Sequence, residues 1–319
     1  MIEQELRGAL AAALDGVPAR QASAAVERLI GHYRGETPTA APVLRDAADA
    51  AAYAAYRMPA TFAAARAALE ALAERAPGWA PAGQLDVGGG TGAAVWAAAQ
   101  VWDTARSTVV LDWAEPALAL GRRLASGVDA LRGAEWRRGS LRGGTAPEWE
   151  PADLVTVSYV LGELADADRR AVVEAAARAA RGAVVLVEPG TPDGYLRIRE
   201  ARDALIAAGL RVLAPCPHDA ACPIVTGQDW CHFAVRVARS SLHRRVKGGE
   251  LPYEDEKFSY VVAARDAIPG AQGPAPARIV RKPQLRKGQV LLDLCEPEPG
   301  LHRRTITKRE GPTYRAARK

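Results

Sequence analysis

The spacing of apolar residues changes twice along the chain. Up to residue 75 they recur at three- and four-residue intervals, as in residues 23–33 and 61–76, and this spacing predicts helices. From residue 84 short apolar runs alternate with helical segments, and beyond residue 231 the alternation stops. Because strands that alternate with helices form βαβ units, the middle of the chain predicts an α/β fold with a mostly parallel, doubly wound sheet.

Three regions follow from this pattern. We expect a helical N-terminal cap over residues 1–80, a Rossmann-like ligand-binding domain over 81–214 and a basic region that bears the cysteines over 215–319. After a Pro- and Gly-rich linker, the end of the chain predicts short basic strands joined by turns. The strands expected in the middle region are 84–89, 107–113, 152–160, 182–190 and 210–215, and the helices are 93–102, 115–127, 166–180 and 194–209.

The composition is that of a soluble globular protein, but its charge is uneven. The 319 residues are 49% hydrophobic and 25% charged. The net charge of +5 hides 19 Lys and Arg against 9 Asp and Glu in residues 231–319. Clustered positive charge attracts anionic partners, so we expect one for the C-terminal region. A merely solubilising basic tail is the alternative.

The location of the protein is predicted from what the chain contains. No uncharged apolar stretch reaches the roughly 18 residues of a membrane span, so no membrane contact is expected. The start of the chain, with Glu3 and Glu5, is too acidic for a signal or transit peptide, which favours a cytoplasmic protein. Four cysteines, one of them isolated, argue against a secreted disulfide framework. The oligomeric state stays open, with a monomer favoured.

A glycine-rich segment, LDVGGGTG, includes the end of the first expected strand and the turn after it. It places Asp86 at the end of the strand and alternate glycines before a helix. Glycines there let the backbone turn tightly and approach a ligand at the N-terminus of the helix. The glycines in question are Gly88, Gly90 and Gly92.

Two ligands compete for this segment. Asp112 ends the next expected strand, where a carboxylate accepts hydrogen bonds from both hydroxyls of a ribose. An acidic residue two positions before the first glycine favours S-adenosylmethionine, because the methionine end of that ligand carries an ammonium group. NAD is the alternative, since Gly88, Gly90 and Ala93 also satisfy the dinucleotide pattern.

The residues at the end of the expected strand 152–160 do not identify a catalytic base. The segment SYVLGEL brings Ser158, Tyr159 and Glu163 to the border of the predicted ligand site. Methyltransferases that act on base amino groups typically carry Asn or Asp, two prolines and an aromatic residue at this place, and this segment does not. We therefore expect Ser158 to contact the ligand and assign no catalytic residue.

Three of the four cysteines lie in one Pro-rich segment, CPHDAACPIVTGQDWC. Their spacing does not match the usual zinc pairs, and Cys216 and Cys222 are each followed by proline, as in iron–sulfur ligation. A metal centre is expected, with an iron–sulfur cluster favoured over zinc. His218 and His232 adjoin the cysteines and can replace one thiolate in a zinc site. Buried structural cysteines are the remaining alternative.

Seven segments together resemble the methyltransferase-like small-ribosomal-subunit family, over residues 50–310. The stretch 216–260 is more specific than the glycine loop. The segments, in chain order, are YAAYRMPATFAAARAALEAL, LDVGGGTGAAVWAA, SYVLGEL, VLVEPGTPDGY, CPHDAACP, DWCHFAVRVARSSLHRRVKGGELPYEDEKFSYVV and RKPQLRKGQVLLDLC.

The resemblance implies a class I methyltransferase fold, binding of S-adenosylmethionine and contact with small-subunit rRNA. Mitochondrial members of the family are small-subunit assembly factors, and bacterial members exist. The resemblance also implies a [4Fe–4S] cluster, with zinc as the alternative. The cysteines that match the cluster ligands are Cys216, Cys222, Cys231 and Cys295.

Three functions are compatible with these features. The first is a methyltransferase, or a degenerate one, that acts on small-subunit rRNA in ribosome assembly. The second is a non-catalytic RNA-binding assembly factor in which ligand and metal only stabilise the fold. The third and weakest is a nicotinamide-dependent redox enzyme that uses the cluster for electrons.

Overall fold

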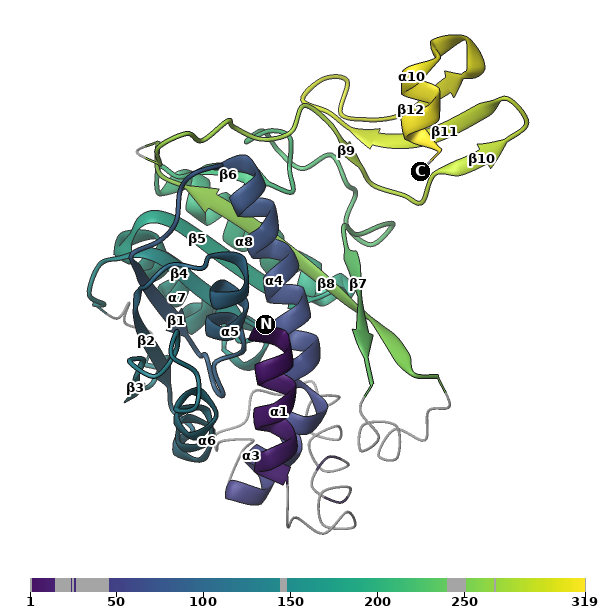
Figure 1. The fold of residues 1–319 in the computed structure, drawn as a ribbon. Helices are drawn as coiled ribbons and strands as arrows, with labels where there is room; N and C mark the ends of the chain where they lie inside the picture. Colours follow the sequence, from purple (N-terminus) through teal and green to yellow (C-terminus); the bar gives the residue numbers. More distant parts are fainter. Residues whose placement is uncertain are drawn as a thin grey trace.

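Two sheets, one large and one small, organise the part of the chain that the structure describes (Figure 1). The computed structural model describes residues 2–14, 24, 26, 46–143, 148–239, 251–266 and 268–318. Within them the large sheet has eight strands and the small sheet has four.

Most strands of the large sheet are buried, as their apolar runs predict. These strands are β1 (Gly83–Val87), β2 (Ser107–Asp112), β3 (Glu135–Arg138), β4 (Ala152–Ser158), β5 (Ala180–Pro189), β6 (Arg211–Ala214), β7 (Phe233–Ala238) and β8 (Tyr253–Ala264). The strands of the small sheet are β9 (Arg278–Ile279), β10 (Gln284–Arg286), β11 (Gln289–Cys295) and β12 (Leu301–Thr307). The exposed strand β3 was not among the predicted elements, because EWRR has little apolar character.

The strand order gives the fold class. The large sheet has the order β3-β2-β1-β4-β5-β8-β6, and β7 pairs with β8. Strands β1 to β5 pair in parallel, whereas β8 runs antiparallel to both β5 and β6. An antiparallel strand inserted beside β5 distinguishes class I methyltransferases from the dinucleotide-binding fold, whose order continues directly after its fifth strand. The predicted class I methyltransferase fold is therefore confirmed, and the topology does not favour the NAD alternative.

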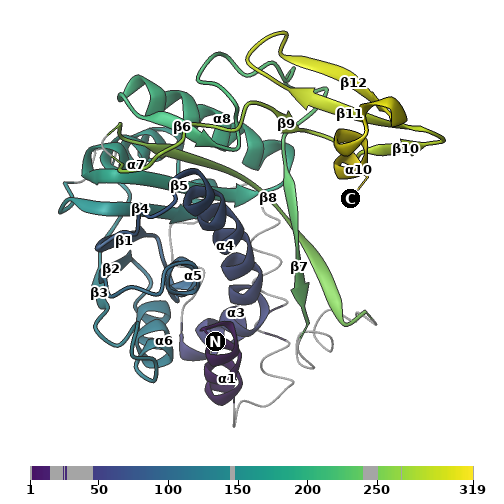
Figure 2. The same ribbon diagram turned by 45° about the horizontal axis from the view of Figure 1, so that its top comes forward.

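Helices cover both faces of the large sheet (Figure 2). Helices α4, α5 and α6 pack on one face together with α1 and α3, and α7 and α8 pack on the other. The helix expected at 23–33 lies almost wholly outside the described residues. No helix in the described part of the chain is long and apolar enough to cross a membrane. The bounds are α1 (Ile2–Leu14), α3 (Ala47–Tyr56), α4 (Met58–Arg75), α5 (Ala93–Val101), α6 (Glu115–Ala125), η1 (Leu161–Glu163), α7 (Asp166–Ala179), α8 (Pro192–Ala207), η2 (Lys308–Glu310) and α10 (Pro312–Ala317).

Strand β5 divides the core between these two layers. Its side chains alternate between the faces of the sheet, as the period of two in a strand requires. Val185 and Val187 join the cluster under α4 and α5, while Val184 and Leu186 join the cluster under α7 and α8. Because both faces are buried, the strand reads as a continuous apolar run rather than as an alternating one.

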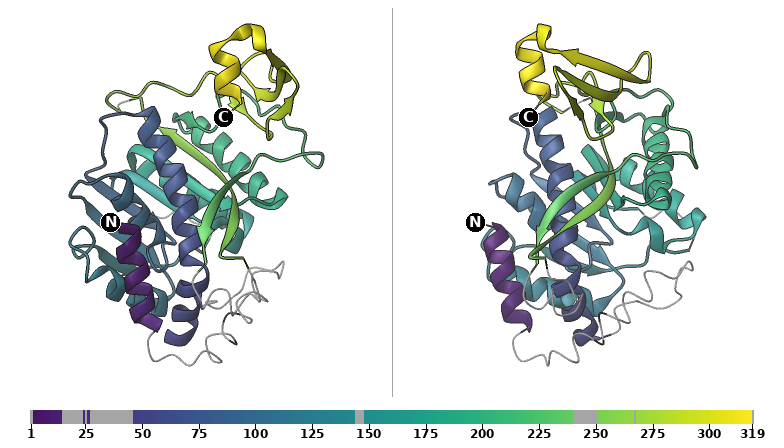
Figure 3. Two further views of the ribbon diagram at one scale, coloured as in Figure 1. Left: turned by 45° about the vertical axis from the view of Figure 1, so that its right-hand side comes forward. Right: turned by 90° about the vertical axis from the view of Figure 1, so that its right-hand side faces the viewer.

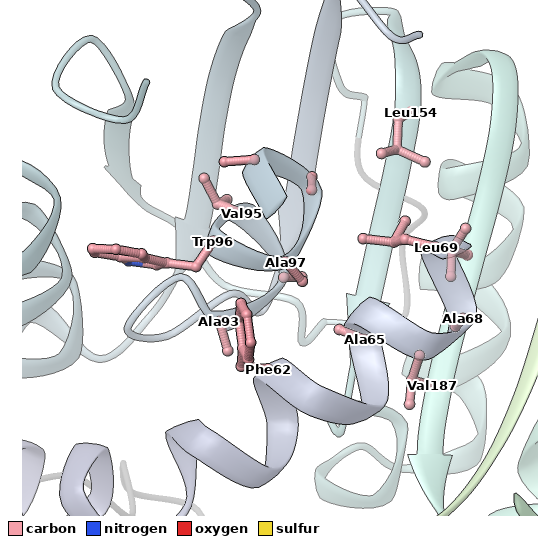
Figure 4. Close-up of a cluster of buried hydrophobic side chains, with 14 of the residues drawn as sticks. Phe62, Ala65, Ala68, Leu69, Ala93, Val95, Trp96, Ala97, Leu154 and Val187 are labelled. Carbon is pink, nitrogen blue, oxygen red and sulfur yellow. The ribbon is translucent and has the colours of Figure 1, made fainter. Parts of the chain in front are cut away.

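Alanine allows α4 and α5 to lie close to each other and to the sheet. Figure 4 shows Phe62 of α4 beside Ala93 of α5, and Leu69 directed toward the strands that carry Leu154 and Val187. All five of these side chains are buried. Small residues let helix backbones approach, and the occasional large side chain fills the remaining space.

Strand β8 belongs to two environments. Its second half, from Phe258 to Ala264, is buried beside β5, whereas its first half pairs only with β7 and forms a ribbon that extends beyond the sheet (Figure 3). The region 215–319 thus supplies a central strand of the large sheet. The division of the chain into three domains stays a prediction.

The small sheet and α10 form a separate layer pair, which we call the C-terminal module (residues 278–318). Alternate residues of β11 face α10, where Tyr314 closes a small apolar core. Figure 2 shows this module beyond one end of α8. The buried residues of its core are Val290, Leu292, Leu294, Ile306 and Tyr314.

Candidate functional site

The glycine-rich segment forms the turn between β1 and α5. Gly88 and Gly90 have φ angles of 65° and 53°, in the left-handed region that glycine enters without strain. Both line a pocket of about 740 Å³, open mouth included, beyond the carboxyl ends of β1, β2 and β4. We call this the glycine-loop pocket. Doubly wound sheets bind ligands at this edge.

Asp112 ends β2 on the wall of the glycine-loop pocket. Its Oδ2 accepts a hydrogen bond from the Gly90 N–H at 2.9 Å, and its Oδ1 accepts one from the Ala114 N–H at 2.8 Å. Burial raises the pKa of this carboxyl, while the backbone donors oppose the rise. Each carboxylate oxygen has a second lone pair, so Asp112 is held in place and keeps the capacity to accept from a ligand.

The other predicted ligand residues differ in position. Ser158, at the end of β4, lines the glycine-loop pocket. Gly92 caps α5 with a φ of 83° and lies outside the lining, where a Cβ would meet the Trp136 ring at 2.6 Å. Asp86 also lies outside the lining, with its Oδ1 accepting from Thr156 Oγ1 at 2.7 Å. Burial raises the pKa of Asp86 to about 7. Gly92 and Asp86 therefore help to shape the glycine-rich turn without lining the pocket.

Several lining residues were not predicted from the sequence. Tyr53 of α3 closes the pocket from the N-terminal helices, and Trp113 follows Asp112 directly. Arg142 places its Cζ 4.4 Å from the centroid of the Trp113 ring. Trp113 could have been predicted from the sequence, because it directly follows Asp112, the residue expected to bind the ribose. Tyr53 and Arg142 lie further away in the chain, and no local pattern marks them. Glu163, which was predicted to border the site, also lines the pocket.

Three hydrogen-bonded side chains, Tyr159, Glu256 and Arg57, lie at the end of β4, and we call them the polar bridge. Tyr159 has a φ of 61°, which is uncommon for a residue other than glycine, and it lines the glycine-loop pocket. Its hydroxyl donates to Glu256 Oε1 at 2.8 Å, and Arg57 binds both oxygens of the same carboxylate at 2.9 and 2.7 Å. Burial, and then Glu256, raise the pKa of Tyr159 well above its usual value. The bridge joins the α3–α4 junction, β4 and β8.

The four cysteines meet at a second pocket, which we call the cysteine pocket. Cys216, Cys222 and Cys231 come from the segment between β6 and β7, and Cys295 comes from the end of β11. The segment is fixed to the large sheet, because Ser259 Oγ donates to the Cys231 carbonyl at 2.8 Å. The structure therefore brings together cysteines that are far apart in the chain.

Burial dominates the chemistry of these thiols. It raises the pKa of Cys216 to about 12 and that of Cys295 to about 11, and it also raises the pKa of Cys231. Neutral thiols are therefore favoured when no cation is bound. A bound cation reverses this preference, because a coordinated thiol loses its proton.

The histidines near the cysteines differ in their contacts. His218 Nε2 lies 3.7 Å from Cys295 Sγ, whereas His232 stacks on Trp230 with ring centroids 5.4 Å apart. Among the described residues, no group of three or more Cys, His, Asp or Glu side chains has a geometry that would hold a metal ion. The predicted iron–sulfur cluster is thus not shown, although the four sulfur donors line a single pocket.

The C-terminal module carries much of the positive charge of its region. Lys282, Arg286 and Lys287 are exposed around β10, and Leu285 between them is 57% exposed. Arg281 pairs with Asp229 of the cysteine segment, which links the module to the large domain. Three further basic residues that precede β8 (244, 245 and 247) lie outside the described residues.

Comparison with known proteins gives a family match over most of the chain. Residues 47–319 match the family model described as mitochondrial small ribosomal subunit Rsm22. The human ribosome assembly protein METTL17, mitochondrial, is 30% identical over 83% of this chain. An Rsm22-cox11 tandem protein of Schizosaccharomyces pombe, also mitochondrial, is 27% identical over 43% of this chain. The chain spans 60% of the length of the human protein and 23% of that of the yeast protein.

Comparison with solved structures gives matches to parts of this chain that are distant in sequence. Magnesium protoporphyrin IX methyltransferase of Synechocystis with bound SAM is 14% identical, with a TM-score of 0.41, and the match covers 66% of this chain and 81% of that one. A TehB-like SAM-dependent methyltransferase of Corynebacterium glutamicum is 17% identical, with a TM-score of 0.38, and the match covers 62% and 87% of the two chains.

Proposed function

The chain belongs to the mitochondrial small ribosomal subunit Rsm22 family, and on that premise we propose that it is a methyltransferase-like assembly protein of the small ribosomal subunit. The observation that carries the proposal is the extent of the match, which includes both pockets and the C-terminal module. The relative described as a ribosome assembly protein supports the same role. The proposed partners are the small subunit and its rRNA.

S-adenosylmethionine is the proposed ligand of the glycine-loop pocket. Gly88 and Gly90 bring the backbone to the ligand, Asp112 accepts from the ribose hydroxyls, and Ser158 borders the methionine end. Asp86 lies beneath the glycine turn and acts through the loop rather than by direct contact. Trp113 and Arg142 form a stacked pair on the wall next to Asp112, where the adenine ring has a flat surface to contact.

One observation favours a ligand-binding role without methyl transfer. Tyr159 occupies the place where methyltransferases that act on bases present their acceptor-binding residues, and its hydroxyl is already bound to Glu256. A tyrosine with a raised pKa keeps its proton at neutral pH and is a poor general base. The non-catalytic assembly factor is therefore the second candidate function.

A metal centre in the cysteine pocket is part of the proposal. The donor set fits, because four sulfurs line one pocket and thiolates are the usual ligands of both [4Fe–4S] clusters and structural zinc. When bound, the centre supplies a cross-link between the segment after β6 and strand β11. Cys216, Cys222, Cys231 and Cys295 would hold it.

Depletion of the protein from growing cells tests the proposed function. We expect mature small subunits to decrease and precursors that sediment more slowly to accumulate, while large subunits are unaffected. Complementation with the unmodified chain is the control and restores the profile. A subunit profile that does not change on depletion contradicts the assembly role.

A further inference from the structure

Three of the polar side chains that line the cysteine pocket interact with its sulfurs. We infer that Tyr195, Arg202 and Arg278 are positioning residues that hold the sulfurs and balance their charge when a metal centre is bound. This inference rests on the proposed metal-binding role of the cysteines. Two of the three come from α8 and one comes from β9.

Tyr195 contacts Cys222. Its hydroxyl lies 3.3 Å from Cys222 Sγ, and its side chain is 5% exposed. The start of α8 is fixed, because Thr191 Oγ1 accepts from the Gly194 N–H at 3.1 Å. A thiolate has no proton to donate, so the phenol must be the donor once the sulfur binds a cation.

Arg202 lies about two turns further along the same face of α8. Its side chain is buried, and its Nη2 donates to the carbonyls of His218 at 2.8 Å and Ala220 at 2.7 Å. These bonds fix the backbone between Cys216 and Cys222. The guanidinium also interacts with the Cys216 sulfur. Arg202 therefore positions this segment and supplies a positive charge beside one of its sulfurs.

Arg278 approaches the pocket from the C-terminal module. It lies opposite Cys295 in the β9–β11 ladder, and its Cζ is 3.5 Å from the centroid of the Phe233 ring. Its Nε is buried and has no hydrogen-bond partner among the described residues. Its guanidinium interacts with the Cys231 sulfur. A buried donor of this kind at the pocket is expected where an anionic group is to be bound.

The charges of this arrangement balance. Four thiolates around a divalent metal or a [4Fe–4S]²⁺ core leave two net negative charges. The guanidiniums of Arg202 and Arg278 supply two positive charges beside these sulfurs, whereas Arg199, which also lines the pocket, bonds the Ile224 carbonyl and Thr226 instead. Hydrogen bonds to ligating sulfurs orient them and tune the centre, and removing such outer partners typically weakens metal binding by about 10- to 100-fold.

Titration with Co²⁺ under anaerobic conditions tests the inference. Co²⁺ bound to thiolates gives charge-transfer absorption. Its intensity reports the number of sulfur ligands, and its dependence on Co²⁺ concentration gives the affinity. We expect Tyr195→Phe and Arg278→Met to bind Co²⁺ about ten-fold more weakly than the unmodified chain. The matched control is Arg265→Met, because Arg265 is also partly buried and its Nη2 donates to the Ala177 carbonyl at 2.6 Å, but it does not line the cysteine pocket.

The outcomes separate the inference from the proposed function. If the unmodified chain binds Co²⁺ through its thiolates and both variants bind as tightly as Arg265→Met, the positioning role is wrong and the metal-binding role stands. If the unmodified chain gives no thiolate absorption with Co²⁺, the metal-binding role itself fails. Binding of S-adenosylmethionine at the distant glycine-loop pocket, measured in parallel, shows that each variant is folded.

Discussion

The glycine-loop pocket and the cysteine pocket are built in different ways. The first is formed at the ends of adjacent parallel strands, and its key contact joins the Gly90 N–H to Asp112 within the large sheet. The second is formed by a segment after β6 and by Cys295 of a separate small sheet. The core of the large sheet holds the first pocket in shape, whereas the second relies on contacts between two separately packed parts of the chain.

This difference predicts which pocket depends on its ligand. Backbone turns backed by a buried sheet keep their geometry without a ligand. Buried thiols with raised pKa values do not attract one another, so a bound cation has to supply the cross-link. We therefore expect loss of metal to affect the C-terminal module strongly and the glycine-loop pocket little.

The largest expected effect is that of Cys295→Ser. This change removes the one sulfur that the module contributes, so the metal centre and its cross-link should be lost together. We expect the melting temperature to fall by about 5 °C or more, with loss of bound metal. Calorimetry and metal analysis of anaerobically purified protein provide the check. Full metal content in the variant would show that Cys295 is not a ligand.

The second effect concerns the glycine-loop pocket. An added Cβ at Gly90 meets only Asp112 Oδ2, at 3.8 Å, so it occupies space next to the ligand rather than the protein core. Gly90→Val should weaken binding of S-adenosylmethionine by about 100-fold or more while metal content is kept. Gly209→Val, at a positive φ with no atom within 4 Å of its Cβ, controls for backbone strain. Tighter binding of NAD than of S-adenosylmethionine in calorimetry would reverse the ligand assignment.

The third effect concerns the charge on the module. Lys282→Glu with Arg286→Glu reverses two exposed positive charges near β10. If both contact phosphates, the dependence of rRNA affinity on salt should flatten by about two units of logarithmic slope. Filter binding across a salt series measures this slope. The matched control is Arg178→Glu with Arg181→Glu on the large domain, and an equal flattening in both pairs would exclude a specific RNA face on the module.

The smallest effect is the pH dependence of Asp86. Its folded pKa of about 7 lies above the unfolded value, so the folded state binds the proton more tightly. The stability that this proton gives is present below about pH 4 and is lost as the pH rises toward about 7. Relative to Asp86→Asn, the unmodified chain should lose several degrees of melting temperature over this range. A constant difference at all pH values would show that Asp86 does not titrate in this way.

The sequence predicted some residues of each pocket and missed others for a physical reason. A strand, a glycine turn, a helix and an acid on the next strand are consecutive in the chain, so Gly88, Gly90 and Asp112 were found from local patterns. Tyr53 closes the pocket from a helix that precedes all of the strands, and no local pattern marks it. The insertion of β8 beside β5 is likewise a long-range pairing.

In the cysteine pocket, too, the sequence did not reveal the lining residues that come from distant parts of the chain. Its four cysteines were predicted as a group because cysteine is rare in this chain, but their polar partners carry no such signal. Tyr195 and Arg202 read as ordinary residues of an amphipathic helix, and Arg278 reads as part of a basic linker. Only the packing of α8 and β9 around one pocket identifies them.

Binding to isolated small ribosomal subunits tests the central claim most directly. The unmodified chain, Gly90→Val and Cys295→Ser are each titrated against small subunits, with large subunits as the specificity control. We expect the unmodified chain and Gly90→Val to bind small subunits equally well. Cys295→Ser should bind at least about ten-fold more weakly, because its basic module is then held to the large domain only by side-chain contacts such as Arg281 with Asp229. Equal binding by Cys295→Ser, or no preference of the unmodified chain for the small subunit, would contradict the account.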